Sequence, residues 1–386
     1  MSEYQYYEFA AIDRPLTRAQ VAELRAVSSR ADITPTGFRN HYEWGNLKAD
    51  PADWMRRYFD AFVYTANWCS CQLMLRLPRS TFCKAELQVF AARPSLAIDA
   101  ADEHWIVVWS LDEGEDYDRF TMDDGNGWMH RLAPIRDELL RGDLRPLYLG
   151  WLAAASVDAL EDDVLEPVPP PGLADLSCAQ QALVEFLAID PDMLAAAAAA
   201  SPASPDVAAG QRDDDLDGWL EQWSPAEMAA VLKLMAQGQG QVAERQVRSR
   251  HAAWLKTRRP QASPDAMRRS LARLRQEAEA ASVIRQERES HARAAQEVEQ
   301  RRLREAHLQR LMTHAKAQWA AADAQAQRGS ASGYGQAVRI LAELAEGYAL
   351  TTTRKAFDLE LRRLLVRHAN RGALLRRLSE AGLWTG

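Results

Sequence analysis

The chain has 386 residues, of which 47% are hydrophobic and 26% charged, and its formal net charge is −7. At roughly 150 residues per domain, this length predicts two or three folded domains. No apolar run approaches the roughly 18 residues of a membrane-spanning helix, so we expect no membrane span. Four cysteines are too few for a disulfide framework, and the first residues lack the basic flank and apolar core of a signal peptide. We therefore expect a cytoplasmic protein.

The net charge hides a strong difference between segments. Residues 101–250 carry 29 acidic and 10 basic side chains, whereas residues 251–386 carry 14 acidic and 25 basic ones. Such asymmetry is typical of an interaction tail or an internal acidic–basic contact. The basic segment could also bind nucleic acid through its phosphates; the alternative, which we favour, is that arginine simply forms and solvates helices. Phosphate contacts would come from four adjacent pairs: Arg258 and Arg259, Arg268 and Arg269, Arg362 and Arg363, and Arg376 and Arg377.

Residues 1–160 predict an α+β domain. We expect strands over 4–12, 36–44, 71–77 and 104–111, and helices over 16–29, 128–141 and 146–158. Thr17 is the expected N-cap of the first helix, and the two later strands are apolar on both faces, which is typical of the middle of a sheet. A further helix should begin at Asp50-Pro51, because proline suits the first turn. Its expected inner face carries Met55, Phe59, Phe62 and Ala66.

Residues 161–176 are rich in acidic residues and proline, and they predict an extended linker between domains. A helical domain is expected over 177–260. A long charged helix should then cover 264–328, either as a single helix or as part of a coiled coil. Its apolar positions recur at heptad-like spacing near both ends: Met267, Leu271, Leu274, Ala278 and Ala281, then Leu308, Leu311, Met312, Ala315 and Trp319.

The middle of this helix carries an alternating series of charges four residues apart: Arg285, Glu289, Arg293, Glu297, Arg301 and Glu305. Residues four apart are neighbours on a helix, so each charge can pair with the next for about 0.2–0.5 kcal/mol. A helix that is polar all round is typical of a solvent-exposed bridge. After the loop GSASGYG at 329–335, Leu-rich helical spacing predicts a terminal helical bundle over 334–386.

Two stretches resemble known bacterial sequences. The N-terminal text YYEFAAIDRPLT with ITPTGFRNHYEWGNLKADP resembles an uncharacterised bacterial protein family to which no activity is assigned. The C-terminal text YGQAVRILAELAEGYAL with FDLELRRLLVRHANRGALLRRLSEAGL resembles the helical module that closes bacterial SWIM-type zinc-finger proteins. These resemblances imply a place in a bacterial multi-gene system and no particular reaction.

The candidate metal sites are incomplete. A SWIM finger binds zinc through Cys-x-Cys and Cys-x-His pairs, and this chain has Cys69, Cys71 and Cys83 but Ala85 in place of the histidine. Structural zinc needs four ligands, which His104 or His130 could complete, yet we favour buried free thiols. The acidic segment 112–127 offers Asp112, Asp116, Asp118 and Asp123 to Ca²⁺ or Mg²⁺, but Tyr117 stands where an EF-hand requires glycine. We expect a solvated loop there, and no metal or other cofactor.

Three functions remain open. The first is a non-catalytic interaction or scaffold protein, whose charged helix separates two ends that dock a protein partner or a second copy. The second is a nucleic-acid-binding protein that uses the arginine pairs. The third is an enzyme with an unrecognised site around His41, Glu43 and the acidic residues of 112–124, because His41 and its neighbours could transfer protons. We favour the first, since the chain lacks the sequence motifs of common hydrolases and nucleotide-binding enzymes.

Overall fold

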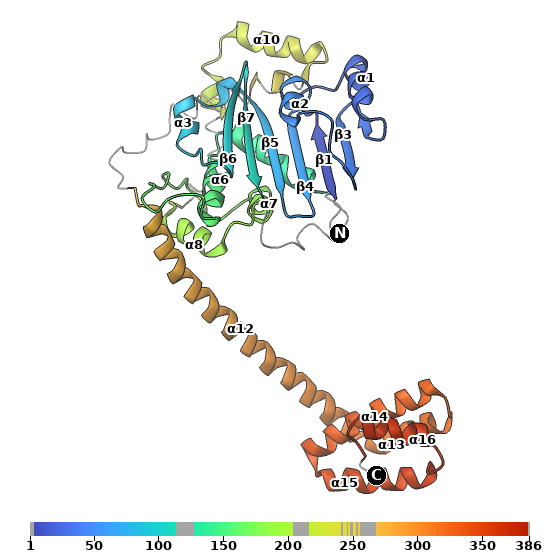
Figure 1. Cartoon of the computed structure of the whole chain (residues 1–386). Helices are drawn as coiled ribbons and strands as arrows, with labels where there is room; N and C mark the ends of the chain where they lie inside the picture. The colour runs from blue at the N-terminus through green and yellow to red at the C-terminus, as the bar shows by residue number, and fades with distance from the viewer. Residues whose placement is uncertain are drawn as a thin grey trace. The chain divides into compact units, whose positions relative to one another are not determined.

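A computed structural model describes residues 4–112, 127–203, 216–240, 242–244, 246–247, 250–251, 254 and 268–384. The chain divides into two compact units, Met1–Ile284 (unit 1) and Arg285–Gly386 (unit 2), each of which is described by itself. Unit 1 contains an antiparallel sheet with seven strands in the described residues, and a long helical region follows (Figure 1). The predicted fold class, an α+β domain followed by a mainly helical region, is therefore confirmed.

The sheet has the strand order β2-β3-β1-β4-β5-β7-β6. Its strands are β1 (Gln5–Ala10), β2 (Asp32–Thr34), β3 (Gly37–Tyr42), β4 (Ala61–Ala66), β5 (Cys71–Pro78), β6 (Leu96–Ala101) and β7 (His104–Leu111). Strands β5 and β7 lie inside the sheet, as their continuous apolar runs predicted. Strands β2 and β6 form the two edges.

The sheet packs on both faces because successive residues of a strand point to opposite sides. Phe62, Met74 and Ile106 point to one face and pack with Leu24 of a covering helix. The other face carries a second set of buried side chains: Ala61, Val63, Leu73, Leu75, Val107 and Trp109. Each fully buried Leu or Phe contributes about 1.5–3 kcal/mol, so both faces stabilise the sheet.

Different helices cover the two faces. Helices α1 (Arg18–Val27) and α2 (Pro51–Arg57) supply residues to the first face. Helices α4 (Trp128–Leu132), α5 (Pro134–Leu140), α6 (Arg145–Ser156), α7 (Cys178–Phe186) and α8 (Pro191–Ala200) cover the second. Further elements of unit 1 are a 3-10 turn (Arg79–Thr81), α3 (Lys84–Gln88) and α10 (Pro225–Ala236). The expected caps are present: Thr17 forms a capping box with Gln20, and the Asp50 side chain accepts a hydrogen bond from the Ala52 amide.

Two expected helices of unit 1 differ in the structure. The helix that begins at Pro51 ends at Arg57, and Phe62 and Ala66 lie on β4 instead of on its inner face. Residues 61–66 are apolar at nearly every position because β4 is covered on both faces of the sheet. We predicted a helix because some of these apolar residues also recur at helical spacing. The helix expected over 128–141 is two helices, because Pro134 starts a new first turn.

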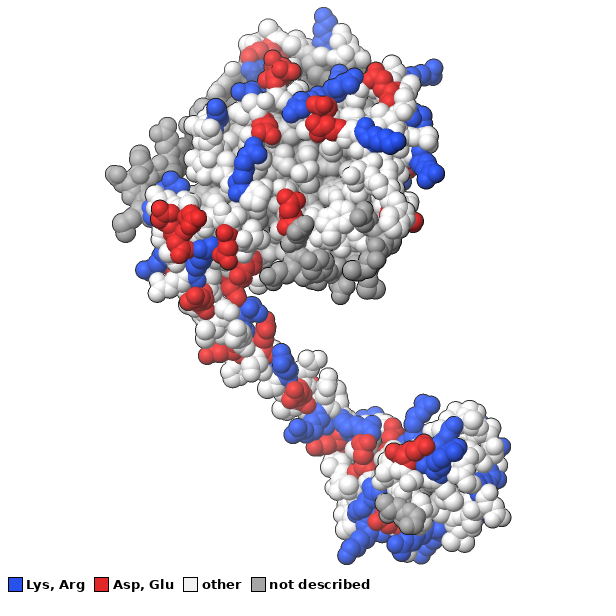
Figure 2. All heavy atoms as spheres, in the orientation of Figure 1, with Lys and Arg blue, Asp and Glu red and all other residues white. Residues whose placement is uncertain are grey.

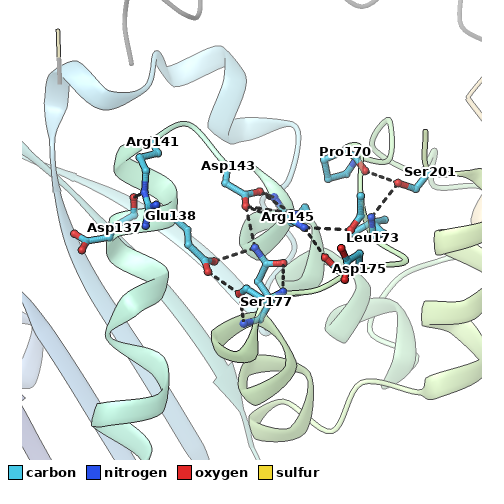
Figure 3. A network of polar contacts seen from close by, with 12 residues as sticks. Asp137, Glu138, Arg141, Asp143, Arg145, Pro170, Leu173, Asp175, Ser177 and Ser201 are labelled. Carbon is cyan, nitrogen blue, oxygen red and sulfur yellow. Dashed lines mark hydrogen bonds and ion pairs between the residues drawn. The ribbon is translucent and has the colours of Figure 1, made fainter. Parts of the chain in front are cut away.

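The predicted linker 161–176 is fixed to unit 1 by hydrogen bonds (Figure 3). Arg145 of α6 pairs with Asp143 at 2.7 Å and donates to the backbone oxygens of Gly172 at 3.1 Å and Asp175 at 2.9 Å. Ser201, just after α8, donates to the Pro170 carbonyl oxygen at 2.7 Å. The prolines at 167–171 lie in a stretch that is neither helix nor strand, and turns lie at 162–163 and 171–174. The segment is bonded to Arg145 of α6 and to Ser201 and does not separate two compact units.

Helices α7 and α8 also belong to unit 1, whereas we expected a separate helical domain over 177–260. Leu183 and Phe186 of α7 are fully buried in the same core as the sheet residues Leu73 and Trp109. Gln180 of α7 donates to Glu138 at 2.9 Å and thereby joins α7 to α5. The sequence pattern gave the helices but not the surface on which they pack.

Unit 2 is a helical bundle. It contains the C-terminal part of α12 (Leu271–Thr313) with α13 (Ala315–Gln327), α14 (Ala331–Thr351), α15 (Arg354–Arg367) and α16 (Gly372–Glu380). Its core consists mainly of leucine: Leu311, Leu341, Leu344, Phe357, Leu361, Leu364, Leu374 and Leu378. The bundle over 334–386 is therefore confirmed, and its leucines form the core, as their helical spacing indicates.

The helix expected over 264–328 is interrupted at His314, where α12 ends and α13 begins. Part of the expected loop 329–335 is helical, because Ser330 caps α14 and accepts a hydrogen bond from the Gly333 amide at 3.1 Å. A Cβ on Gly333 would lie 2.7 Å from the Gln325 carbonyl oxygen. This glycine therefore allows α13 and α14 to pack closely and does not mark a loop.

Candidate functional site

The six alternating charges lie on α12, and every residue from Gln286 to His307 is exposed. Arg285 pairs with Glu289 at 3.0 Å. We expected each charge to pair with the next, but among the described residues the charges from Arg293 to Glu305 form no ion pair with one another. Exposed pairs contribute only about 0–1 kcal/mol, so these charges chiefly keep the helix solvated.

Both ends of α12 are anchored in a hydrophobic core, as the apolar spacing predicted. Leu271, Leu274 and Ala278 pack in the core of unit 1. Leu311 packs in the core of unit 2, where Met312 and Trp319 also contact it. Of the predicted positions, Met267 lies outside the described residues. The helix therefore has two buried ends and a fully exposed stretch at 286–307.

Of the two arginine pairs in unit 1, the structure describes Arg268 and Arg269, and both form contacts within the protein. The side chain of Arg269 is 14% exposed; its Nη2 donates to Glu166 Oε1 at 2.9 Å, and it also pairs with Glu277. Arg268 donates to the backbone oxygens of Glu166 at 2.8 Å and Leu165 at 3.1 Å. Both residues thus attach α12 to residues 165–166. Arg258 and Arg259 lie outside the described residues.

In unit 2 the pairs are divided between intramolecular contacts and solvent. Arg363 pairs with Glu360 at 2.6 Å, and Arg377 donates to the Ala331 carbonyl oxygen at 2.6 Å. Arg362 and Arg376 are exposed, and within the described part of the chain neither forms an ion pair. Figure 2 shows Lys and Arg side chains on the surface of unit 2.

The four cysteines do not form a cluster that could bind zinc. Cys69 and Cys71 are buried, and the Cys71 thiol donates to the Phe186 carbonyl oxygen at 2.9 Å. Cys83 is exposed at the N-terminus of α3, contrary to the expectation of a buried thiol, and Cys178 is exposed as well. Among the described residues, His, Cys, Asp and Glu form no group of three that could hold a metal ion. Asp116, Asp118 and Asp123 of the acidic segment lie outside the described residues.

His41 and Glu43 line a cavity of about 600 Å³ beside β3. One wall is Val27–Arg30, which follows α1, and the other includes Asn40–Trp44 with Asn46 and Lys48. The His41 ring stacks on Tyr4, with the ring centroids 6.2 Å apart. Arg39, on the same strand as His41, forms an ion pair with Asp32 at 2.7 Å. The cavity is open to solvent, and most of its lining residues are polar or charged.

A buried network of charges was missed at the sequence level. Asp60 is fully buried and pairs with Arg76 at 2.7 Å, and it accepts hydrogen bonds from the amides of Ile12 at 2.7 Å and Asp13 at 2.8 Å. Arg136 of α5 pairs with Asp13 at 2.9 Å. The available signal was Arg76 within the apolar strand CQLMLRL, because a buried charge needs a partner.

The network stabilises the charged form of Asp60. Burial alone would raise the pKa of Asp60, but the charge of Arg76, the Asp13 amide and the charge of Arg136 together hold it below its ordinary value. Every member of this network has a partner inside the protein, so its role is to connect β4, β5 and α5.

Comparison of the sequence with protein-family models, with curated proteins and with solved structures finds no match. The two bacterial resemblances therefore stay predictions. Among the described helices, none combines the length and the apolar character that crossing a lipid bilayer requires.

Proposed function

We propose that this protein is a non-catalytic cytoplasmic interaction protein in which α12 joins two folded units that bind separate partners. The observation that carries the proposal is the stretch 286–307, which is exposed at every residue yet belongs to one helix. At about 1.5 Å per residue, this stretch measures roughly 30 Å. A helix that is polar all round and anchored at both ends is suited to bridging solvent between folded parts.

Exposed apolar side chains on each unit support the proposal. In unit 1, every residue of α10 is at least partly exposed, including Leu232 at 64% and Met235 at 57%. In unit 2, Leu359 and Val366 of α15 are 53% and 78% exposed. Clustered exposed apolar residues often mark protein interaction sites.

The test is affinity capture with the tagged full-length chain from its native host, followed by light scattering of the purified complex. Leu232→Glu with Met235→Glu should remove one bound protein, and Leu359→Glu with Val366→Glu should remove a different one. Lys233→Glu and Lys355→Glu serve as matched controls, because each replaces a positive by a negative charge on the same helix. This changes the net charge as much as the paired substitutions do and leaves the apolar residues in place. A chain that stays a monomer and captures nothing would overturn the proposal.

A second candidate function is nucleic-acid binding by unit 2, which the exposed Arg362 and Arg376 favour. Binding through phosphates should weaken steeply between 50 and 200 mM salt, by about 10³-fold or more if six or more contacts form. Fluorescence anisotropy with a labelled 20-nucleotide RNA and a 20-base-pair DNA measures this. Arg362→Glu with Arg376→Glu should weaken binding, with Arg302→Glu as the control on α12. Absence of a complex at 50 mM salt would exclude this function.

A further inference from the structure

One edge of β3 is only partly covered. Strand β1 pairs with β3 along its whole length, from Gly37 to Tyr42. On the other side, β2 pairs only with Gly37–Arg39. In the described residues, the part of β3 beyond Arg39 therefore has a neighbouring strand on one side alone.

The hydrogen-bond pattern between β1 and β3 determines which backbone groups of β3 face this open edge. The Ala11 amide donates to the Thr36 carbonyl oxygen at 2.9 Å, and these two residues occupy opposite positions when the β1–β3 register is continued. Because antiparallel pairs alternate between bonded and non-bonded, residues 38, 40 and 42 direct their N–H and C=O toward β1. The backbone N–H and C=O of His41 consequently point away from β1, toward the open edge.

The cavity of about 600 Å³ lies at this same edge. His41 and Glu43 line one wall, and Ser29 and Arg30 line the opposite wall. Two other lining residues are joined by a hydrogen bond, in which the Asn40 amide donates to Ser28 Oγ at 3.3 Å. A peptide in the cavity would thus meet unused backbone hydrogen-bonding groups on its β3 side.

The rim of the cavity indicates the side chains that such a peptide would carry. Arg30 and Lys48 are exposed, and in the described ranges neither forms an ion pair with a carboxylate, whereas Glu43 is the only acidic residue of the lining. Trp44 is 73% exposed. Acidic side chains would neutralise Arg30 and Lys48, and an apolar side chain would cover Trp44.

We propose that the open edge of β3 binds an extended acidic segment of a partner protein, which adds a strand to the sheet beside His41. The inference rests on the proposed interaction function and names the partner class of unit 1. Strand addition obtains affinity from main-chain hydrogen bonds and specificity from pockets for alternate side chains. The open edge favours a peptide over a nucleic acid, which has no strand of amide groups to offer.

The test is fluorescence polarisation of the full-length chain with a labelled eight-residue peptide of alternating Glu and Val. The same peptide with Lys in place of Glu is the control. We expect saturable binding of the acidic peptide and at least tenfold weaker binding of the basic one. Arg30→Gln with Lys48→Gln should lower the affinity for the acidic peptide about tenfold, since two exposed ion pairs with the peptide are lost.

A pair of variants at one position separates backbone from side-chain recognition. His41→Pro removes the N–H that faces the open edge and leaves the β1 ladder intact, because proline is tolerated where the N–H does not join the ladder. His41→Pro should lower the affinity for the acidic peptide at least tenfold. His41→Ala, which keeps the N–H, should lower it less than threefold. Circular dichroism of both variants confirms that the sheet is retained.

Several outcomes would overturn the inference. The acidic peptide could fail to bind saturably, or it could bind with the same affinity as the basic peptide. Equal effects of the two His41 variants, or displacement of the peptide by a 20-nucleotide RNA, would also overturn it. Failure of the proposed function is distinguishable, because Leu232→Glu with Met235→Glu and Leu359→Glu with Val366→Glu change captured partners but should leave this peptide affinity unchanged.

Discussion

Units 1 and 2 keep their charges in different places. Unit 1 buries charged side chains beneath its sheet, where Arg76 and Asp60 are 7% and 1% exposed. In the described part of unit 2, the ion pairs of arginine, such as Arg304–Glu346, remain on the surface, with side chains 44% and 53% exposed. His368 is buried and contacts Asp323 at 2.7 Å, and the rest of the core is built mainly from leucine. Replacing a single buried charged residue should therefore lower the free energy of unfolding of unit 1 strongly. In unit 2, many apolar residues each contribute a part of the stability.

The largest expected effect comes from breaking the buried network of unit 1. Asp60→Asn leaves Arg76 without its carboxylate, while Arg136 keeps its pair with Asp13, and removal of one partner from a buried ion pair costs about 3–5 kcal/mol. Urea unfolding followed by tryptophan fluorescence measures this, because ten of the twelve tryptophans lie in residues 1–284. Glu346→Gln in unit 2, followed by circular dichroism, is the control and should change the free energy of unfolding of unit 2 by less than about 1 kcal/mol. Equal effects of the two variants would contradict the contrast.

The second expected effect compares buried and exposed positions of the same helix. Leu274→Ala, in the core of unit 1, should lower the free energy of unfolding by about 2–5 kcal/mol because it leaves a cavity. Leu303→Ala, at a position that is 58% exposed, should change it by less than about 0.5 kcal/mol. Urea unfolding followed by circular dichroism tests both. A large loss for Leu303→Ala would indicate that the exposed stretch of α12 packs against another surface.

The pH dependence of unit 1 follows from Asp60. The pKa of Asp60 in the folded state is lowered, because Arg76, the Asp13 amide and Arg136 together outweigh the effect of burial. The stabilisation is therefore fully present above the unfolded-state pKa of about 3.9 and is lost as the pH falls through the lower folded-state value. Urea unfolding between pH 7 and pH 2 should show this loss in the tryptophan signal. Asp60→Asn should flatten the pH dependence, and an unchanged profile in that variant would contradict the assignment.

The smallest expected effect concerns the exposed charges of α12. Glu297→Gln removes a charge that forms no ion pair with its described neighbours, so the free energy of unfolding should change by less than about 0.5 kcal/mol. Arg285→Gln, which removes the Arg285–Glu289 pair, should cost about 0.2–0.5 kcal/mol. A larger loss for Glu297→Gln would show that the alternating charges act as a connected series.

The sequence predicted elements better than it predicted their contacts. Alternation and caps located β3, α1 and the start of α2, and apolar spacing located the buried ends of α12. The spacing of Phe62 and Ala66 also fits a helix, and only the sheet neighbours of β4 decide between the two. The packing of α7 on the sheet depends on contacts between residues far apart in sequence, which no local pattern contains.

The candidate site shows the same division. His41 and Glu43 were found from their place on an alternating strand, and the structure brings both to one cavity. The open edge of β3 was not predictable, because it depends on the length of β2 and on the course of the chain after α1. Arg269 read as a possible phosphate contact, yet its partner Glu166 lies 103 residues earlier.

The central claim is that α12 remains one helix across 286–307 in solution. Spin labels at Glu287→Cys and Gln309→Cys, with Cys83 and Cys178 replaced by Ser, allow a pulsed dipolar distance measurement. We expect one narrow distribution centred near 33 Å, since 22 residues rise about 1.5 Å each, and Ala295→Pro should broaden it. A broad distribution in the chain without proline would contradict the claim.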